Sequence, residues 1–419
     1  MDTVKQLIQD VPIPRMSKVR QIFDDTGIPN VESEVRKQFQ ESEVLESISK
    51  GDKVAIAVGS RGVADIPTLT REVVNAIKSV GGDPFIVPAM GSHGGATAEG
   101  QLGVLKQLGV TEASVHAPIR SSMEVVEVGR LSNGLPIYID KNAYTADKIV
   151  VINRVKPHTA FRGKAESGLL KMITIGLGKQ KGAEAAHSYG FKYMAEHVPE
   201  MAKIVLQETP IIFGLATVEN AYDRPAKIRM IPAHKMVELE PDLLLEAKTL
   251  MPSILFDPID VLIVDELGKD ISGDGMDPNI TGRYPTPYAS GGPSAKRIAV
   301  LGLTEKTHGN ANGIGLADMT TKKVFETIDL EQGYANALTS TVVGTVKVPM
   351  VLDTEELAVK AAIKTSNAFD LHKIRMVRIK NTLDIKEIEI SESLVPEART
   401  KSNIELLTEP NTAKFLSSS

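Results

Sequence analysis

The chain has 419 residues, a formal net charge of -5 and no cysteine. The absence of cysteine excludes disulfides and thiolate metal sites, and the negative charge gives no support to binding of nucleic acid or of an anionic membrane. No apolar run reaches the roughly 20 residues that a membrane helix needs, and the N-terminus lacks a basic-then-apolar signal pattern. We therefore expect a cytoplasmic protein.

The length favours more than one domain, because a single hydrophobic core rarely grows beyond about 250–300 residues. The order of predicted strands and helices indicates an α/β fold of two domains, each a mostly parallel sheet flanked by helices, with the active-site cleft between them. We expect an N-terminal catalytic domain over residues 1–254, a C-terminal α/β domain over 255–385, and a tail over 386–419 that can return to the first domain.

Short runs of β-branched residues predict buried strands, and apolar residues at helical spacing predict helices. In the first half, strands are expected at 53–58, 84–88, 124–128, 135–139, 149–152 and 211–218, and helices at 68–80, 99–108 and 236–250. In the second half, strands are expected at 261–264, 297–303, 375–379 and 385–390, and helices at 322–337 and 354–365. The polar residues 1–50 favour one or two helices before the first strand.

Two glycine-rich loops follow the first two predicted strands. The loop with Ser60, Arg61 and Gly62 suits an anion, because main-chain N–H groups and an arginine converge there; a plain strand-to-helix turn explains it equally well. Asp65 is expected to cap the following helix. His93 stands in the second loop, GSHGG. A lone loop histidine is usually structural, but its place at the end of a parallel strand favours a functional role.

The stretch from residue 148 to 191 is the strongest candidate site. A buried strand ends there in Arg154, Lys156 and His158, and a segment rich in glycine and lysine then leads to His187. Imidazoles at two strand ends, those of His93 and His158, can act as acid and base on opposite faces of a bound molecule. A zinc site is the competing interpretation, although the histidines lack an HxH or HExxH pattern.

Two polar loops follow predicted strands in the second half. The first contains Asp270 and Arg283, and the second contains His308. Long loops in a compact domain are usually functional. We therefore expect these three side chains to contribute to substrate binding.

His158, Lys171 and His187 follow one another at spacings that are typical of one protein family. Lys171, in the sequence SGLLK, lies thirteen residues after His158, and His187 lies sixteen residues after Lys171. With the upstream sequences SRG and GSHGG, this order resembles the nickel-pincer-nucleotide-dependent lactate racemase family of 2-hydroxyacid racemases and epimerases. Two positions depart from the family pattern, since Val58 replaces an acidic residue and Gly62 replaces a proline.

The resemblance implies a role for each matching position. Lys171 would carry the nickel-pincer nucleotide covalently, and His187 would be the protein ligand of the nickel. His93 and His158 would be the two acid/base catalysts, and Arg61 would bind the substrate carboxylate with its bidentate guanidinium. Further cofactor contacts are expected from Ser60, Gly62, Ser167 and Gly168.

The implied activity is inversion of C2 of a 2-hydroxy acid, in which a hydride passes to the cofactor and returns to the other face of a planar 2-keto acid. The polar loops of the second half favour a sugar acid or a dicarboxylate over lactate. The expected partners are this small molecule and the enzymes that make the cofactor, without nucleic acid or membrane, and a homodimer is possible. Protein from a host without the cofactor pathway would lack the cofactor.

Three alternatives remain open from the sequence. Lys164 is a rival for the covalent lysine, although its distance to His187 does not fit. An NAD-type dehydrogenase or a sugar-acid dehydratase would be a different enzyme, and against the dehydrogenase no GxGxxG follows a strand with an acidic residue about 20 positions on. A non-catalytic ligand-binding protein is the third alternative, which nickel content and intact mass would distinguish.

Overall fold

The computed structural model describes residues 2–60, 62–413 and 415. The chain forms two compact units, one from Asp24 to Met251 and the other from the residues up to Phe23 together with those from Pro252 onward. Among the residues that the structure describes, no helix is both long and apolar enough to cross a membrane.

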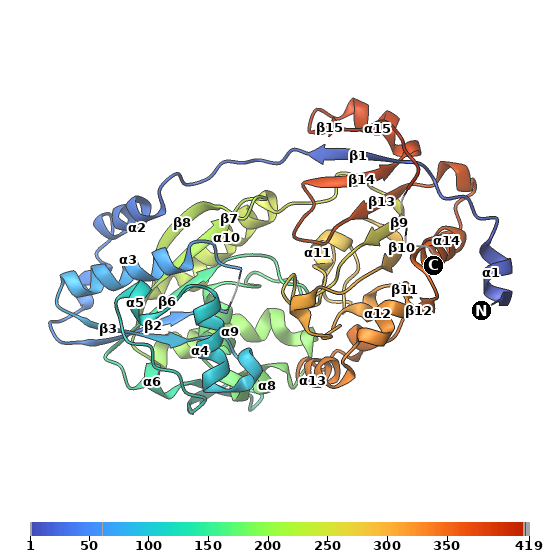
Figure 1. The fold of residues 1–419 in the computed structure, drawn as a ribbon. Helices are drawn as coiled ribbons and strands as arrows, with labels where there is room; N and C mark the ends of the chain where they lie inside the picture. The colour runs from blue at the N-terminus through green and yellow to red at the C-terminus, as the bar shows by residue number, and fades with distance from the viewer. Residues whose placement is uncertain (1, 61, 414, 416–419) are drawn as a thin grey trace. The chain divides into compact units, whose positions relative to one another are not determined.

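The Asp24–Met251 unit is built on a five-stranded sheet in the order β3-β2-β6-β7-β8, shown in Figure 1. All neighbouring pairs are parallel except β7 with β8. The strands are β2 (Lys53–Val58), β3 (Asp83–Pro88), β6 (Lys148–Arg154), β7 (Ile211–Glu219) and β8 (Pro225–Pro232).

Helices cover both faces of this sheet, which explains why its strands read as continuous apolar runs. On one face, Val35 and Phe39 of α2 and Leu69 and Val73 of α3 pack in a core cluster with the strands. On the other face, α7 and α10 contact β7. The helices of the unit are α2 (Val31–Gln40), α3 (Ile66–Ser79), α4 (Ala98–Gln107), α5 (Glu112–Val115), α6 (Lys141–Tyr144), α7 (Leu169–Lys171), α8 (Lys179–His187), α9 (Met194–Glu208) and α10 (Met236–Leu250).

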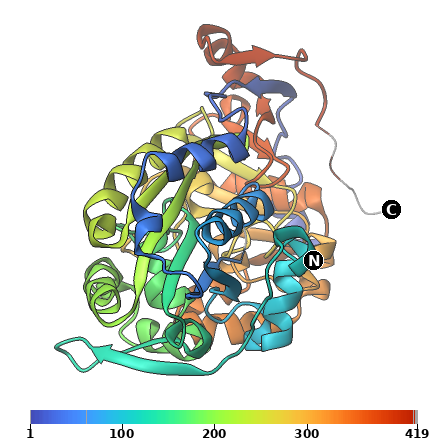
Figure 2. The ribbon, with the colours of Figure 1, turned by 90° about the vertical axis from the view of Figure 1, so that its left-hand side faces the viewer.

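A separate antiparallel ribbon joins β4 (Val125–Arg130) to β5 (Pro136–Asp140). It is the teal hairpin at the edge of its unit in Figure 2. Its strands match the predicted pair, and β4 contacts α9.

The second unit contains an eight-stranded mixed sheet in the order β12-β11-β10-β9-β13-β14-β1-β15. The first five strands run parallel to their neighbours, and β14, β1 and β15 run antiparallel to theirs. The strands are β1 (Met16–Gln21), β9 (Ile259–Val264), β10 (Ala295–Val300), β11 (Met319–Thr321), β12 (Met350–Leu352), β13 (Met376–Ile379), β14 (Glu387–Ser391) and β15 (Ile404–Leu406).

Apolar residues of α14 and of the N-terminal segment pack on this sheet. Val359 and Ile363 of α14 join Ile8 in one core cluster with the strands. The helices of the unit are α1 (Asp2–Ile8), α11 (Pro278–Thr281), α12 (Lys322–Thr327), α13 (Leu330–Ser340), α14 (Glu355–Thr365) and α15 (Val395–Thr400). The two units therefore give the α/β fold, with mostly parallel sheets flanked by helices, that the sequence predicts.

The units differ from the expected domain ranges at both ends of the chain. The division after Met251 lies close to the expected boundary, but the residues up to Phe23 lie in the other unit. There β1 pairs with β14, so Val19 faces Ile388 across the sheet. The tail thus pairs with the N-terminal segment inside the second unit, because β1 lies between β14 and β15, a position that its sequence alone does not predict.

Two local expectations are wrong. Asp65 occupies the N-cap position of α3, but it has a left-handed backbone with φ of 55° and its side chain makes no capping hydrogen bond. The single helix expected over 322–337 is two helices, because Asp329 caps a new helix with a bond from Gln332 N to its carboxylate.

Candidate functional site

The carboxyl ends of three neighbouring strands carry the candidate residues of the first half. The strands β3, β2 and β6 are adjacent and parallel, so the loops that follow them leave the sheet at one edge. Ser60 follows β2, His93 follows β3 and His158 follows β6. Open α/β sheets bind their ligands at this edge.

His93 lies in an exposed loop that bonds to the loop after β2. Its Nδ1 is 2.6 Å from the Oγ of Ser60. The next residue, Gly94, has φ of +67°, and a Cβ there would lie 2.5 Å from the carbonyl carbon of Gly100, so the turn needs glycine. The two glycine-rich loops therefore lie together.

The loop after β2 also bonds to β6, since Arg154 Nη1 donates to the carbonyl of Gly62 at 3.3 Å. Arg61 lies outside the described residues, and its role at a substrate carboxylate stays a prediction. The expected contacts of Ser60 and Gly62 with a cofactor are likewise untested.

Main-chain pairing between Lys156 and Ser167 closes the loop that carries His158. Each backbone nitrogen donates to the carbonyl of the other residue, at 2.8 and 3.1 Å. Inside the loop, Oε2 of the buried Glu166 accepts from the backbone nitrogen of His158 at 2.8 Å, and Oε1 lies 2.7 Å from Nζ of Lys248. The ion pair compensates the cost of burying the carboxylate.

The ring of His158 packs among aromatic side chains and is held neutral. Its centroid lies 4.5 Å from that of Phe161 and 5.9 Å from that of Phe191. Its Nδ1 accepts from the backbone nitrogen of Ala160 at 3.0 Å, which places the proton of the neutral ring on Nε2. Burial lowers the pKa of His158 well below its usual range, and the neighbouring ionisable groups lower it further, in the order Lys171, His187, Lys156 and Arg162.

Lys171 ends the single turn α7, from which the chain continues directly into a π-helix, η3 (Met172–Gly176). Single π-helical turns are frequent at functional sites. The start of α7 is tied to β6, because Asn153 Nδ2 donates to the carbonyl of Gly168 at 2.8 Å. Gly168 and Ser167 thus lie beside the His158 loop, where the sequence predicts cofactor contacts. The rival Lys164 is exposed.

His187 ends α8 with one ring nitrogen engaged. Its Nδ1 lies 2.6 Å from the carbonyl oxygen of Ala183 and donates to it, which leaves Nε2 unprotonated in the neutral ring. Burial lowers the pKa of His187 to about 4; the bond to Ala183 opposes this shift and the charge of Lys171 adds to it. The ring centroid of His187 lies 5.3 Å from that of Phe191, which also contacts His158. The structure thus brings His158, Lys171 and His187 together.

Residues 10–197 match the family described as the lactate racemase N-terminal domain. The segment 10–197 of this chain is thus a lactate racemase-family domain. The lactate racemase apoprotein from Thermoanaerobacterium thermosaccharolyticum has a similar structure, with a TM-score of 0.50 and 15% identity over 88% of this chain and 99% of that one. A structural-genomics protein from Thermotoga maritima matches with a TM-score of 0.49 and 15% identity, over 66% of this chain and 71% of that one. A search of curated protein sequences gives no match.

The match to this domain supports a racemase-type activity. The matched range includes every candidate residue of the first half, from Ser60 to His187. The structural likeness independently supports the fold, and the sequence motifs and the family match agree on the same segment.

The three candidates in the second half lie in the other unit and do not form one group within it. Asp270 is exposed just beyond the end of β9, and its Oδ1 accepts from the hydroxyl of Thr304 at 2.5 Å. His308 is exposed with a left-handed backbone. Arg283 instead contacts the beginning of β10, where Nη2 donates to the carbonyl of Ala295 at 3.2 Å and pairs with Asp318 at 3.1 Å. The guanidinium of Arg283 thus already has a structural role.

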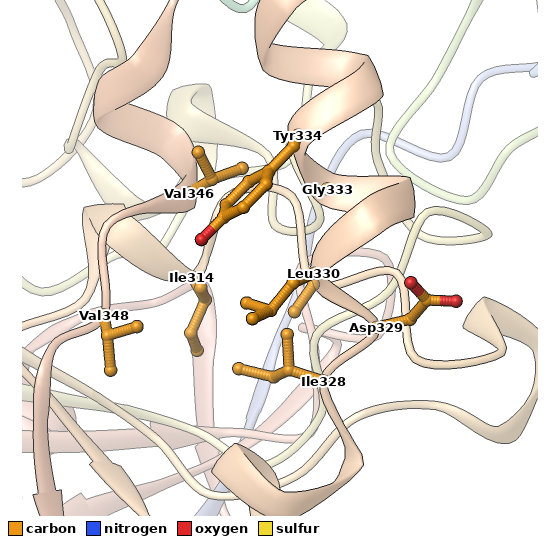
Figure 3. Close-up of a pocket in the computed structure, with 9 residues that line it drawn as sticks. Ile314, Ile328, Asp329, Leu330, Gly333, Tyr334, Val346 and Val348 are labelled. Atoms are coloured by element: carbon orange, nitrogen blue, oxygen red, sulfur yellow. The ribbon is translucent and has the colours of Figure 1, made fainter.

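The second unit also contains an apolar pocket with an empty volume of about 270 Å³, shown in Figure 3. Its lining is aliphatic apart from Asp329 and Tyr334. It holds none of the predicted site residues. Its two polar side chains, Asp329 and Tyr334, are not among the groups that the sequence predicts for proton transfer.

Several polar side chains that support the site escape the sequence patterns, since no motif marks them. They are the buried residues Gln101, Asp140, Glu166, Lys179 and Glu240. One sequence feature could have revealed such a residue: an ionisable side chain at a position where the helical pattern expects an apolar one. Glu240 is an example, because it shares a helical face with the buried Met236, Leu243 and Leu244.

Glu240 of α10 lies against the beginning of α7. Its Oε2 accepts from the backbone nitrogen of Leu170 at 3.0 Å, and its Oε1 has no hydrogen-bond partner among the described residues. Burial raises the pKa of Glu240 to about 7, against the lowering effect of the N–H groups of Leu170 and Leu169. The turn α7, which ends at Lys171, is thus hydrogen-bonded to the carboxyl group of Glu240, whose pKa is near neutral pH.

Proposed function

We propose that this protein is a racemase or epimerase that inverts C2 of a 2-hydroxy acid by hydride transfer with a nickel-pincer nucleotide. The supporting observation is the convergence of Lys171, His158 and His187, which the sequence separates by thirteen and sixteen residues. An amine that can be acylated, a neutral, partly buried imidazole and a second imidazole with a fixed tautomer are the groups that this chemistry needs.

The residues around His187 fit the nickel group. A metal needs a deprotonated ring nitrogen, and a hydrogen bond at the other nitrogen commonly fixes the tautomer; the bond from His187 Nδ1 to Ala183 does so here. Among the residues described, no cluster of three or more His, Cys, Asp or Glu side chains could hold a metal. A nickel ion at His187 would take its remaining donors from the nickel-pincer nucleotide, which brings its own carbon and sulfur donors.

When bound, the nickel-pincer nucleotide would accept the hydride from C2 and return it. Lys171 would hold this group through its amine. The protein would then supply two proton-transfer groups, one for each enantiomer, and His158 and His93 are proposed for these roles.

The hydrogen bond that His158 makes in the structure restricts when its ring can act as a base. Its Nδ1 accepts from Ala160 N, so Nε2 carries the proton. The contact keeps the ring neutral, because a protonated Nδ1 cannot accept a hydrogen bond. Nε2 can take a substrate proton only after the ring releases Ala160 and exchanges tautomers. His93, bonded through Nδ1 to Ser60 Oγ, would serve the opposite face.

The charges around His158 favour an anionic ligand. Lys156 and Arg162 both lower its pKa, so positive groups remain beside the ring when the amine of Lys171 carries the cofactor. A carboxylate or phosphate in this environment is stabilised by the same charges. The polar loops with Asp270 and His308 extend the proposal to a sugar acid or a dicarboxylate as the substrate.

The test is co-production of the chain with the enzymes that make the cofactor. Intact mass should show an adduct in wild type and in K164R but none in K171R, and nickel should accompany the adduct. Chiral chromatography should then show interconversion of the enantiomers of malate, lactate or a sugar acid, with C2 retaining its hydrogen in D₂O. A loaded protein that exchanges C2 hydrogen with solvent, or one that carries neither adduct nor nickel, would contradict the proposal.

A further inference from the structure

The side chain of the buried Lys179 contacts three other elements, β3, α4 and β5, through Pro88, Gln101 and Asp140. Lys179 is the first residue of α8 and has no solvent exposure, and its backbone is left-handed with φ of 56°. Its Nζ donates to the carbonyl of Pro88 at 2.5 Å and to Oε1 of Gln101 at 2.9 Å, and it pairs with Asp140 at 3.2 Å. A left-handed residue with a Cβ costs free energy, so other contacts must hold it in place.

Gln101 carries this network into the His93 loop. Its Oε1 accepts from Lys179, and its Nε2 donates to the carbonyl of Gly91 at 2.9 Å and to the carbonyl of His93 at 3.3 Å. The side chain is fully buried. One amide group thus contacts both sides of the turn that presents the His93 ring.

The loop around His93 also has main-chain bonds, from His93 N to Met90 O at 3.1 Å, from Ala96 N to Ser92 O at 3.2 Å and from Gly91 N to Gly176 O at 3.0 Å. Gly91, Gly94 and Gly95 all have positive φ, and so does Ala96. A loop of left-handed glycines has a high conformational entropy when it is released. Its fixed geometry therefore depends on anchors from neighbouring elements.

We propose that Gln101 and Lys179 are positioning residues for His93. Lys179 opens the helix that ends in His187, and Gln101 connects this lysine to the backbone of the His93 loop. The network therefore fixes the loop of one candidate acid/base group to the helix of the candidate nickel ligand. The assignment of an acid/base task to His93 rests on the proposed function; the anchoring itself does not.

The ion pair explains why the anchor is rigid. Burial lowers the pKa of Lys179 and raises that of Asp140, and each partner opposes the shift of the other. Asp140 is itself fixed, because its Oδ1 accepts from the backbone nitrogen of Ala143 at 3.0 Å. A buried pair with fixed partners has one favourable geometry and offers Gln101 a constant donor.

The test compares Q101E with Q107E in the full chain. Q101E keeps an oxygen for Lys179 but removes both N–H donors to the loop, and Gln107 is an exposed residue of the same helix. Hydrogen exchange of the amides of residues 91–96 should become about tenfold faster in Q101E and stay unchanged in Q107E. The ¹⁵N spectrum of the His93 ring should change from one tautomer to an average, while that of His187 should not move.

The uncharged variant Q101M tests the same proposal if Q101E does not fold. Q101M has nearly the volume of glutamine and buries no new charge, and it should loosen the same loop. K179M should loosen the loop and also change the ¹⁵N signals of His187, because it removes the anchor of both elements. Wild-type exchange rates and a wild-type His93 spectrum in Q101E or Q101M would overturn the proposal.

Activity separates this proposal from the proposed function. In cofactor-loaded protein, Q101E should lower kcat more than it raises KM, because the substrate contacts remain. If wild type shows no racemase activity but Q101E still loosens the loop, the positioning role stands and the function fails. If wild type racemises its substrate and Q101E leaves the loop unchanged, only the positioning role fails.

Discussion

The main chains of Lys156 and Ser167 hydrogen-bond to each other in both directions, at 2.8 and 3.1 Å. The loop of His158 lies between these two residues, and the turn of Lys171 begins directly after them. One pairing therefore sets the separation of two groups that are thirteen residues apart in sequence. Because the loop contains no regular structure, its interior must be held by side chains, chiefly by Glu166.

E166A should remove this support and destabilise the protein by about 1–3 kcal/mol, because a backbone donor loses its acceptor while the partly exposed Lys248 and Arg162 can be hydrated. Lys248 and Arg162 would be left without their carboxylate, and the backbone nitrogen of His158 would lose its acceptor. Urea unfolding measures the effect. The control is E184A, an exposed glutamate of α8, which should change stability by less than about 0.5 kcal/mol. Equal effects of the two variants would contradict the role of Glu166.

Glu240 should make stability depend on pH in an unusual direction. Its pKa is raised from 4.5 to about 7 in the folded protein, so the folded state binds a proton more tightly than the unfolded state. The stability that this proton contributes is complete below about pH 4.5 and is lost as pH rises through 7, a loss of about 3 kcal/mol.

E240Q should remove this dependence, because glutamine keeps the acceptor for Leu170 N but does not titrate. The difference in unfolding free energy between E240Q and wild type should therefore grow in favour of E240Q between pH 5 and pH 8. The exposed Glu238 of the same helix supplies the control, E238Q, whose difference from wild type should stay constant. Parallel pH profiles for wild type and E240Q would contradict the raised pKa.

Much of the fold could be predicted from local sequence. The apolar runs at 53–58 and 211–218 are buried on both faces, so their composition alone marks them as strands. The strand β1 could not be predicted in this way, because its residues alternate with charges and its partners β14 and β15 lie at the other end of the chain. The break before Asp329 was missed because apolar spacing continues across it.

The sequence motif predicts that His158, Lys171 and His187 share one site, and in the structure these three residues lie near one another. Local sequence could not reveal Gln101 or Lys179, since their function is to bond elements that are far apart in the chain. The role predicted for Arg283 in substrate binding is untested. A cation in a polar loop suggests a ligand, yet its guanidinium bonds to Asp318 and to main-chain carbonyls.

H187A should abolish nickel binding while leaving the adduct on Lys171 in place. The covalent bond needs only the amine, whereas the metal needs the free Nε2 that the bond to Ala183 prepares. Intact mass measures the adduct, and metal analysis of the same sample measures nickel. H234A, at an exposed histidine of the same unit, should keep both. Retention of nickel by H187A would show that another group is the ligand.

G168A should displace the turn of Lys171. The backbone of Gly168 is extended, with φ of 177°, so alanine adds no backbone strain, but its Cβ would lie 2.6 Å from Cδ of the buried Glu240. We expect a destabilisation of about 1–3 kcal/mol and a smaller yield of the Lys171 adduct. G103A is the matched control, because a Cβ there meets nothing within 4 Å and alanine favours the helix by up to about 1 kcal/mol.

The cause of the G168A effect can be isolated in a double-mutant cycle with E240A. If the added methyl group acts by colliding with the carboxyl group, G168A should cost almost nothing in the E240A background, and the coupling energy should be about 1–3 kcal/mol. Additive effects would mean that the methyl group disturbs α7 by another route, such as the bond from Asn153 to the carbonyl of Gly168. Guanidinium unfolding of the four proteins should be measured at pH 8, where Glu240 is charged in wild type. The coupling energy should be largest there, because the carboxylate then has least freedom to move from its N–H donors.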